Sequence, residues 1–322
     1  VVALGTSSYE LSRALVSALG WLPFDEAAVY IRRFLATNST ALRRIGIAAA
    51  AVHRHDPGQP LVNAVDAADG SLRARAIRAV GELGRADLLP VLKSSFDAGD
   101  DQVRFAAAWS IARLADDAGA TEILRTIVEN GTTGHERALP LALGKMEVSQ
   151  AVKWIRHLNE NPRLVRTAIR GAGLLGLPDL VPWLIDIIPV AQLARLAGEA
   201  FCMITGIQLA LDGLEGRRPA GFESGPTDDP KDHNVAMDAD ENLFWPDQNK
   251  VAAWWRANSH RFEPGTRYFV GKPMTIDWLN HVLRHGYQRQ RAAAALELAI
   301  RQPGTPLFEV RAPGFRQQEL LR

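Results

Sequence analysis

Apolar residues recur along the first two-thirds of the chain at the spacing of short amphipathic helices. The clearest example is the stretch 72–96, whose first helical stripe consists of Leu72, Ala76, Ile77, Val80 and Leu83. Gly84 follows as a stop signal, and the apolar positions of residues 88–96 predict a second, shorter helix with a proline in its first turn. A pair of helices this short does not bury its own apolar face, so we expect similar pairs stacked on both sides.

One phrase, an arginine that opens an apolar run rich in alanine or glycine, recurs seven times at intervals of 29 to 33 residues. The arginines are Arg13, Arg43, Arg73, Arg104, Arg137, Arg166 and Arg195. A second phrase, DLLPVL at 87–92, is echoed as DLVPWL at 179–184, about three repeats later. A period near thirty residues predicts an all-α fold, an α-solenoid of about seven repeats over residues 1–212.

The periodicity fails at Asp212, where an acidic segment rich in glycine and proline begins. We expect residues 213–243 to form a long loop, either a solvated excursion or a segment that contacts a partner. Its candidate partner-binding residues are Asp238, Asp240 and Glu241. As a long surface insertion, the loop is expected to add little to stability.

An aromatic-rich segment follows the loop, and four of the eight tryptophans lie between residues 245 and 278. Such side chains bury a large area each, and an open solenoid end needs a cap. We therefore expect residues 244–322 to form a C-terminal helical cap with tryptophans in its core and further helices at 275–285 and 288–302. The alternative is an exposed aromatic binding patch. The tail 308–322 is polar, and its Arg311 and Arg316 are further candidate partner-binding residues.

The period and its arginine-led openings resemble the short HEAT-like repeats first described in phycobilisome lyases. Later segments, among them GEAFCMITG (198–206), PGTRYFVGKP (264–273) and RAPGFRQ (311–317), resemble an uncharacterised proteobacterial HEAT-repeat family. Members of that family are sometimes encoded near type VI secretion components. The resemblance implies a fold but brings no activity with it.

The charge balance and the cysteine content indicate which partners and which cellular compartment to expect for the chain. Thirty-seven Lys and Arg against 36 Asp and Glu give a formal charge of +1, which predicts no general attraction to nucleic acid or anionic lipid. The chain lacks an apolar run long enough to span a bilayer. The single cysteine, Cys202, fits a reducing compartment, so we expect a cytoplasmic protein.

Motifs for catalysis, metals and nucleotides are absent from the sequence: it contains no CxxC pair, HExxH, GxxxxGK[ST] or GxSxG. We predict no catalytic residue, cofactor or metal site. A helical column of Asp277, His281 and His285 offers metal-binding side chains but also reads as an exposed polar stripe. Apolar neighbours around Cys202 suggest an inert thiol.

Glu199 lies in an apolar helix, where a carboxylate needs a partner, and we expect it to be buried and paired with a repeat arginine. The seven recurring arginines, here called the arginine ladder, admit two interpretations. They either pair with acids in the turns, such as Asp69, Asp100 or Asp101, or line a groove that binds phosphate groups. Balanced charge and the lack of interleaved aromatic residues favour structural pairing.

These patterns favour a protein–protein interaction scaffold, an adaptor or accessory factor in a bacterial assembly, whose partner is another protein. Two alternatives stay open: an enzyme or lyase-like protein that handles a cofactor, and a HEAT-like nucleic-acid-binding module. A pocket with Glu199 or His281 open to solvent would favour the first, and a continuous positive groove would favour the second.

Overall fold

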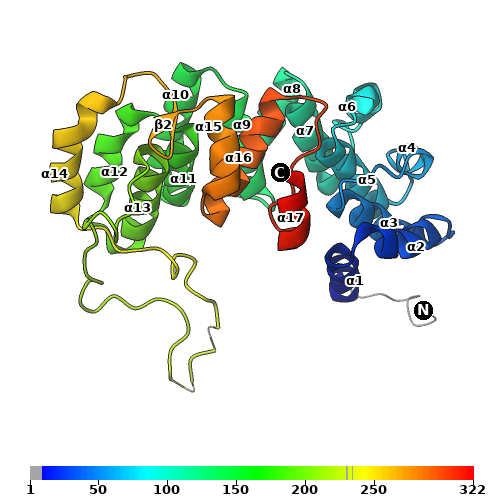
Figure 1. The fold of residues 1–322 in the computed structure, drawn as a ribbon, viewed down its shortest axis with the longest axis horizontal. Helices are drawn as coiled ribbons and strands as arrows, with labels where there is room; N and C mark the ends of the chain where they lie inside the picture. The colour runs from blue at the N-terminus through cyan, green and yellow to red at the C-terminus, as the bar shows by residue number, and fades with distance from the viewer. Residues whose placement is uncertain (1–8, 230, 234) are drawn as a thin grey trace. The chain divides into compact units, whose positions relative to one another are not determined.

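A computed structural model describes residues 9–229, 231–233 and 235–322 of the chain (Figure 1). Its backbone contacts divide it into two units. Unit 1 contains the described residues up to Lys145 together with Leu283–Arg322, and unit 2 is Met146–Val282. The divisions predicted after residues 212 and 243 stay predictions.

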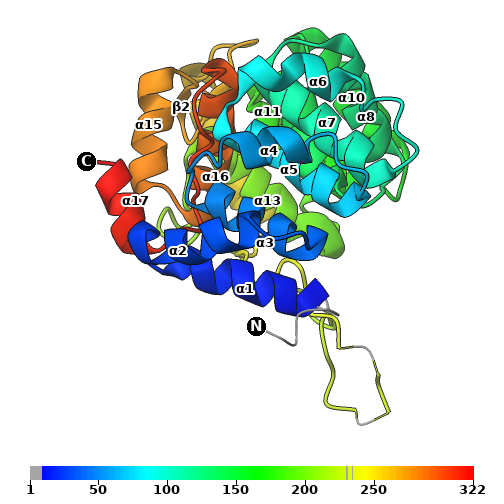
Figure 2. The same cartoon turned by 90° about the vertical axis from the view of Figure 1, so that its right-hand side faces the viewer.

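Unit 1 is helical throughout its described residues. Its helices are α1 (Tyr9–Trp21), α2 (Phe24–Leu35), α3 (Thr40–Val52), α4 (Gln59–Ala64), α5 (Gly70–Leu83), η2 (Ala86–Leu88), α6 (Leu89–Lys93), α7 (Asp101–Leu114), α8 (Ala118–Glu129), α9 (His135–Gly144), α16 (Gln288–Arg301) and α17 (Gly314–Leu320). Helix α1 packs on α3, and α3, α5 and α7 stack one on the next, with α2, α4, α6 and α8 alongside them (Figures 1 and 2).

Side-chain caps set where several of these helices begin. Ser39, Asp69, Asp100 and Asp117 each accept a hydrogen bond from a backbone N–H in the first turn of the helix that follows. Such a cap is worth about 1 kcal/mol because it satisfies a donor that the helix cannot. The recurrence of caps in consecutive repeats explains why helices this short are well defined. Their apolar faces are covered by neighbours, and α7 is buried from Phe105 to Leu114.

Unit 2 continues the same architecture and adds one hairpin. Its elements are α10 (Val148–Glu160), α11 (Val165–Leu175), η3 (Pro178–Leu180), α12 (Val181–Ile187), α13 (Ala191–Thr205), α14 (Gln248–Asn258), η4 (Ser259–Arg261), β1 (Tyr268–Phe269) and β2 (Lys272–Pro273). The last helix, α15 (Ile276–His285), carries the boundary between the units. Strands β1 and β2 pair antiparallel, Tyr268 with Pro273 and Phe269 with Lys272.

The echo between residues 87–92 and 179–184 corresponds to one local structure in each unit. Helices α5 and α11 each end at a left-handed glycine, Gly84 and Gly176, and a 3-10 turn and a short helix follow. At Gly176, with φ of 76°, a Cβ atom would lie 2.1 Å from the carbonyl oxygen of Tyr268. Glycine is therefore required there by both conformation and contact.

The hairpin covers the ends of two repeat helices in unit 2. Tyr268 donates its backbone N–H to the carbonyl of Gly176 at 2.7 Å, and Val270 donates to Met203 at 2.7 Å. These bonds satisfy carbonyl groups that a helix terminus leaves without partners. The mostly helical repeat fold with an aromatic cluster in the C-terminal region is confirmed. The extent of the cap over residues 244–322 stays a prediction.

The aromatic cluster of the cap differs from the prediction in its composition. Its buried members are Phe262, Tyr268 and Phe269, whereas Trp254 and Trp255 lie at its margin and are partly exposed. The ring of Phe262 lies 5.0 Å from that of Tyr268 and 5.3 Å from that of Trp255. An indole carries a polar N–H that favours a partly wet position, which explains why phenylalanine rather than tryptophan fills the centre.

Residues 213–243 contain no helix or strand where the structure describes them, and they extend away from the helices as a long excursion (Figure 1). The base of this loop is closed, because Gly216 donates its N–H to the carbonyl of Trp245 at 2.7 Å and Asp247 donates to Leu214 at 2.9 Å. Leu214 is buried. The loop is therefore tied at its ends rather than freely appended.

Candidate functional site

The seven ladder arginines all fall on one series of helices. Each lies near the beginning of its helix, and in order the helices are α1, α3, α5, α7, α9, α11 and α13. The thirty-residue period thus marks the helices that stack on one another within each unit.

The partners of these arginines differ from repeat to repeat. Arg73 donates to the hydroxyl of Ser95 at 2.9 Å, and Arg104 forms an ion pair with Asp101. Asp69 and Asp100 serve as helix caps instead. Arg137 lies over the ring of Phe105, 5.1 Å from its centroid. The repeat therefore determines the position of each arginine on its helix, whereas the neighbouring residues determine which group its side chain binds.

The last two ladder arginines hold the acidic loop of unit 2. Arg166 binds both carboxylate oxygens of Asp240 at 2.7 Å, and Arg195 forms an ion pair with Asp238 and donates to the backbone carbonyl of Asp240 at 2.9 Å. The Arg195 guanidinium also lies 4.6 Å from the centroid of the Trp245 ring. Asp240 is 4% exposed. Both contacts to Asp240 come from the same nitrogen of Arg166, and charge-assisted hydrogen bonds of this kind are about twice as strong as those between neutral groups.

This arrangement changes the interpretation of the loop acids. Asp238 and Asp240 face arginines of their own chain, so their carboxylates are already engaged, while Glu241 is exposed. Burial alone would raise the pKa of Asp238, but hydrogen bonds from Ser224, the Asp240 N–H and Arg195 outweigh it and lower the pKa to about 2. The ion pair between Asp238 and Arg195 therefore stays charged at neutral and mildly acidic pH.

We expect Asp240→Asn to loosen the loop. The variant removes the charge that faces Arg166 while keeping the shape of the side chain, and we expect a loss of about 1–3 kcal/mol in the free energy of unfolding. Amide hydrogen exchange across 213–243 should accelerate. The matched control is Asp228→Asn, which removes the same charge at an exposed position of the same loop. Equal exchange rates in the two variants would show that Asp240 does not anchor the loop.

A concave surface of unit 1 encloses a cavity of about 1800 Å³, here called the unit 1 concavity. It is lined by residues of α1, α3, α5, α7 and α8, the start of α9, and the segment 309–316. Among the described residues, eight arginines and four carboxylates line it. The arginines are Arg13, Arg44, Arg75, Arg78, Arg104, Arg137, Arg311 and Arg316.

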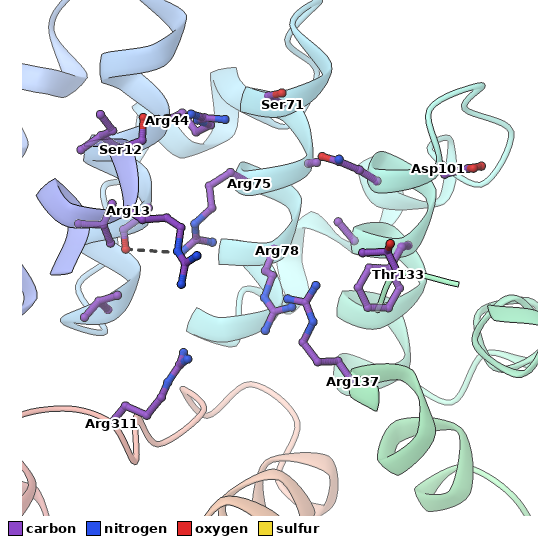
Figure 3. Close-up of a pocket in the computed structure, with 18 of the residues that line it drawn as sticks. Ser12, Arg13, Arg44, Ser71, Arg75, Arg78, Asp101, Thr133, Arg137 and Arg311 are labelled. Carbon is purple, nitrogen blue, oxygen red and sulfur yellow. Dashed lines mark hydrogen bonds between the residues drawn. The ribbon is translucent and has the colours of Figure 1, made fainter. Parts of the chain in front are cut away.

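Several of these guanidinium groups converge. Arg78 and Arg137 point toward one another, and Arg311 extends from the C-terminal segment toward the same space (Figure 3). Arg78 lies over the ring of Trp109, 4.3 Å from its centroid, and donates to Glu82 at 2.9 Å. Like charges that converge in this way repel one another, so the surface is complementary to an anionic group.

Glu82, a carboxylate whose side chain is 13% exposed, fixes two of the arginines of the concavity. Glu82 pairs with Arg75 and Arg78, each at 2.9 Å. Burial alone would raise the pKa of Glu82, but the charges of Arg75, Arg78 and Arg54 outweigh it and lower the pKa to about 2. Arg54, whose pKa is lowered by burial, also pairs with Glu309 at 3.2 Å.

The two candidate arginines of the tail occupy different environments. Arg311 is largely exposed at the concavity and contacts Glu309 at 3.3 Å. Arg316 is held more firmly, donating to the carbonyl of Gly20 at 3.1 Å and to a ring nitrogen of His53. Arg311 is thus open to a partner, whereas Arg316 fastens the tail to the first repeat.

Glu199 and Cys202 lie one turn apart on α13. Glu199 is partly buried rather than fully enclosed. Burial, and secondarily the charge of Glu199, raises the pKa of the Cys202 thiol to about 12. A thiol of this pKa is a poor nucleophile at neutral pH, because almost none of it is thiolate.

We therefore expect Cys202 to react with a thiol reagent such as dithionitrobenzoate orders of magnitude more slowly in the folded protein than in guanidinium chloride at pH 8. Absorbance of the released thionitrobenzoate measures both rates. Comparable rates in the two conditions would contradict the burial of this side chain.

The histidine column offers no assembled metal site. His281 stacks on Trp278 with ring centroids 4.6 Å apart, and both His281 and His285 are exposed. Across residues 9–229, 231–233 and 235–322, no group of three or more His, Cys, Asp or Glu side chains is placed to hold a metal ion.

Sequence reasoning did not single out Arg44, Arg75, Arg78 or Trp21, all of which line the concavity. A signal for two of them was present, because Arg13, Arg44 and Arg75 are separated by 31 residues each. The predicted ladder contains Arg43 and Arg73 instead, which lie one and two residues before Arg44 and Arg75.

Comparison with known proteins supports the repeat class. A family model of HEAT repeats matches residues 58–139, which include α5, α7 and α8 of the concavity. This stretch is therefore a HEAT repeat domain. Comparisons with curated proteins and with solved structures found no match. None of the described helices is long and apolar enough to cross a membrane.

Proposed function

We propose that this chain is a protein-interaction scaffold that binds another protein in the unit 1 concavity. HEAT repeats are typical of such scaffolds, and the match over residues 58–139 covers helices that build the concavity. The observation that carries the proposal is this concave surface of about 1800 Å³ across successive repeats. Its size suits a polypeptide segment better than a single small molecule.

Within this role we place the chain as an adaptor or accessory factor in a bacterial assembly in the cytoplasm. Resemblance of its later segments to a family sometimes encoded beside type VI secretion components supports such an assembly as the setting. We propose that it acts by binding rather than by catalysis. The raised pKa of the Cys202 thiol and the pairing of Glu82 with two arginines support this view.

Site-directed photo-cross-linking tests the proposal. Thr126→p-benzoylphenylalanine and Thr133→p-benzoylphenylalanine place the probe in the concavity, and Val29→p-benzoylphenylalanine places it on an exposed position of α2 that does not line it. We expect one protein to cross-link from both concavity positions and not from Val29. The purified partner should then bind the full chain in isothermal titration calorimetry. Identical products from all three positions, or no binding by the purified partner, would overturn the proposal.

A further inference from the structure

The arginines of the concavity form a row with one member in nearly every repeat. Positions 13, 44, 75, 106 and 137 follow one another at 31-residue intervals, and all of them line the concavity. They lie on α1, α3, α5, α7 and α9 in turn. Four are arginines, and the fifth is Ala106. A row of this kind offers the same contact repeatedly along one line, as a linear ligand requires.

The chemistry of the lining favours carboxylates as the groups to be recognised. Eight arginines and four carboxylates line it, and a fifth carboxylate, Glu82, pairs with two of these arginines, so an excess of positive charge remains. No lysine lines the concavity among the described residues. The planar fork of a guanidinium binds a carboxylate or a phosphate through two parallel hydrogen bonds, which an ammonium group does not.

Apolar side chains in the same surface favour a polypeptide over a nucleic acid. Trp21 is 65% exposed at the concavity, and Phe105 and Ile123 also line it. Tryptophan and arginine are the residues most enriched at the energetic centres of protein interfaces. Glu10 and Glu122 in the lining would repel a continuous phosphate backbone, whereas a peptide can place neutral residues opposite them.

We infer that the concavity binds an extended acidic segment of the partner protein, with a carboxylate at about every third residue. Packed helices lie about 8–10 Å apart. A chain in the extended polyproline II conformation has three residues per turn and advances about 3.1 Å per residue, so every third side chain lies on the same face and meets the next helix of the row. This inference rests on the proposed scaffold function and specifies the partner by its chemistry.

Fluorescence anisotropy with defined probes tests the inference on the full chain. The first probe is a fluorescein-labelled peptide of five Glu-Leu-Ser repeats, and the second replaces every Glu by Gln. A third peptide has the composition of the first with its glutamates in one block. The fourth probe is a single-stranded oligothymidine of equal charge. We expect the first peptide to bind at least about tenfold more tightly than each of the others, with affinity falling as salt rises.

A triple variant, Arg13→Gln, Arg137→Gln and Arg311→Gln, removes lining charges at exposed positions and leaves the buried pairs of Glu82 intact. Its control, Arg32→Gln, Arg33→Gln and Arg163→Gln, removes the same charge from exposed positions that do not line the concavity. We expect the first variant to weaken binding of the Glu-Leu-Ser peptide by about tenfold or more and the control to change it less than about twofold. Thermal melting checks that both variants fold.

Each contrary result has a definite meaning. Equal binding of the Glu and Gln peptides, or equal loss in both triple variants, would overturn recognition of carboxylates. Equal binding of the peptide whose glutamates form one block would overturn the spacing of one carboxylate at about every third residue and leave only non-specific electrostatic attraction. Tighter binding of oligothymidine would assign the surface to nucleic acid. If the cross-linked partner still binds the lining variant with full affinity, this inference fails while the scaffold proposal stands.

Discussion

Glu82→Gln is expected to lower the free energy of unfolding by about 3–5 kcal/mol. The substitution leaves Arg75 and Arg78 without the carboxylate that each contacts at 2.9 Å, and Arg54 loses a neighbouring negative charge. Uncompensated buried cations are expensive because the surrounding protein solvates them poorly. Urea-induced unfolding followed by circular dichroism measures the change.

The pH dependence of this effect has a definite sign. The pKa of Glu82 falls from its ordinary value of 4.5 to about 2 in the folded protein. A carboxylate with a lowered pKa stabilises the fold fully above the pKa of the unfolded chain, and this contribution is lost as pH falls through the folded value. The difference between wild type and Glu82→Gln should therefore be complete above about pH 5 and should shrink between about pH 4.5 and pH 2.

Glu122→Gln is the matched control for Glu82→Gln. Glu122 also pairs with an arginine, Arg125 at 3.0 Å, but the two side chains are 65% and 34% exposed. Water solvates this pair in either state, so the stability of this variant should stay close to that of the wild type. A similar loss in both variants would show that the Glu82 cluster is not stabilised by burial of its charges.

Phe201→Ala is expected to destabilise unit 2 by about 3–5 kcal/mol, the usual cost of removing a fully buried aromatic ring. Phe201 lies on α13, has no exposed surface, and meets the edge of Trp254 with ring centroids 5.6 Å apart. Its loss opens a cavity between the last repeat helix and α14 of the cap. Thermal unfolding followed by tryptophan fluorescence reports on this contact directly.

Two further variants provide comparisons for the loss of stability in Phe201→Ala. Phe244→Ala removes the same ring from a position that is 56% exposed and should leave stability nearly unchanged. Trp255→Ala should cost less than Phe201→Ala, because the indole of Trp255 is partly exposed at the margin of the cluster. A greater loss for Trp255 would mean that the tryptophans form the core of the cap. If Phe201→Ala does not fold, Phe201→Leu provides a milder test with a smaller cavity.

The repeat fold could be predicted from the sequence because local signals specify each helix and the same signals recur in each repeat. Helix length, the caps at Asp69 and Asp100, and the stop at Gly84 all act within a few residues of where they stand. The period then determines which helices stack. Gly265 and Gly271, both with positive φ, mark the turns around the hairpin at 268–273.

The ion pairs between distant residues could not be predicted in the same way. Asp240 lies 74 residues from Arg166, and Glu309 lies 255 residues from Arg54. No periodicity links such positions, and each carboxylate had several arginines to choose from. The loop acids therefore looked available for a partner when two of them already had one. The concavity was not predicted for a related reason, since Arg44 and Arg75 lie in a second row that shares only Arg13 and Arg137 with the ladder.

Unit 1 is assembled from two separate stretches of the chain, and this has a consequence for its biosynthesis. The segment after α16 closes the unit: Leu307 donates its N–H to the carbonyl of Glu82 at 2.8 Å, and Arg113, fully buried, donates to the carbonyl of Thr305. A ribosome releases these residues only after all of unit 2 has emerged. During translation the early repeats therefore stay incomplete, and their buried arginines still lack acceptors. We expect a nascent-chain chaperone to bind the early repeats at this stage.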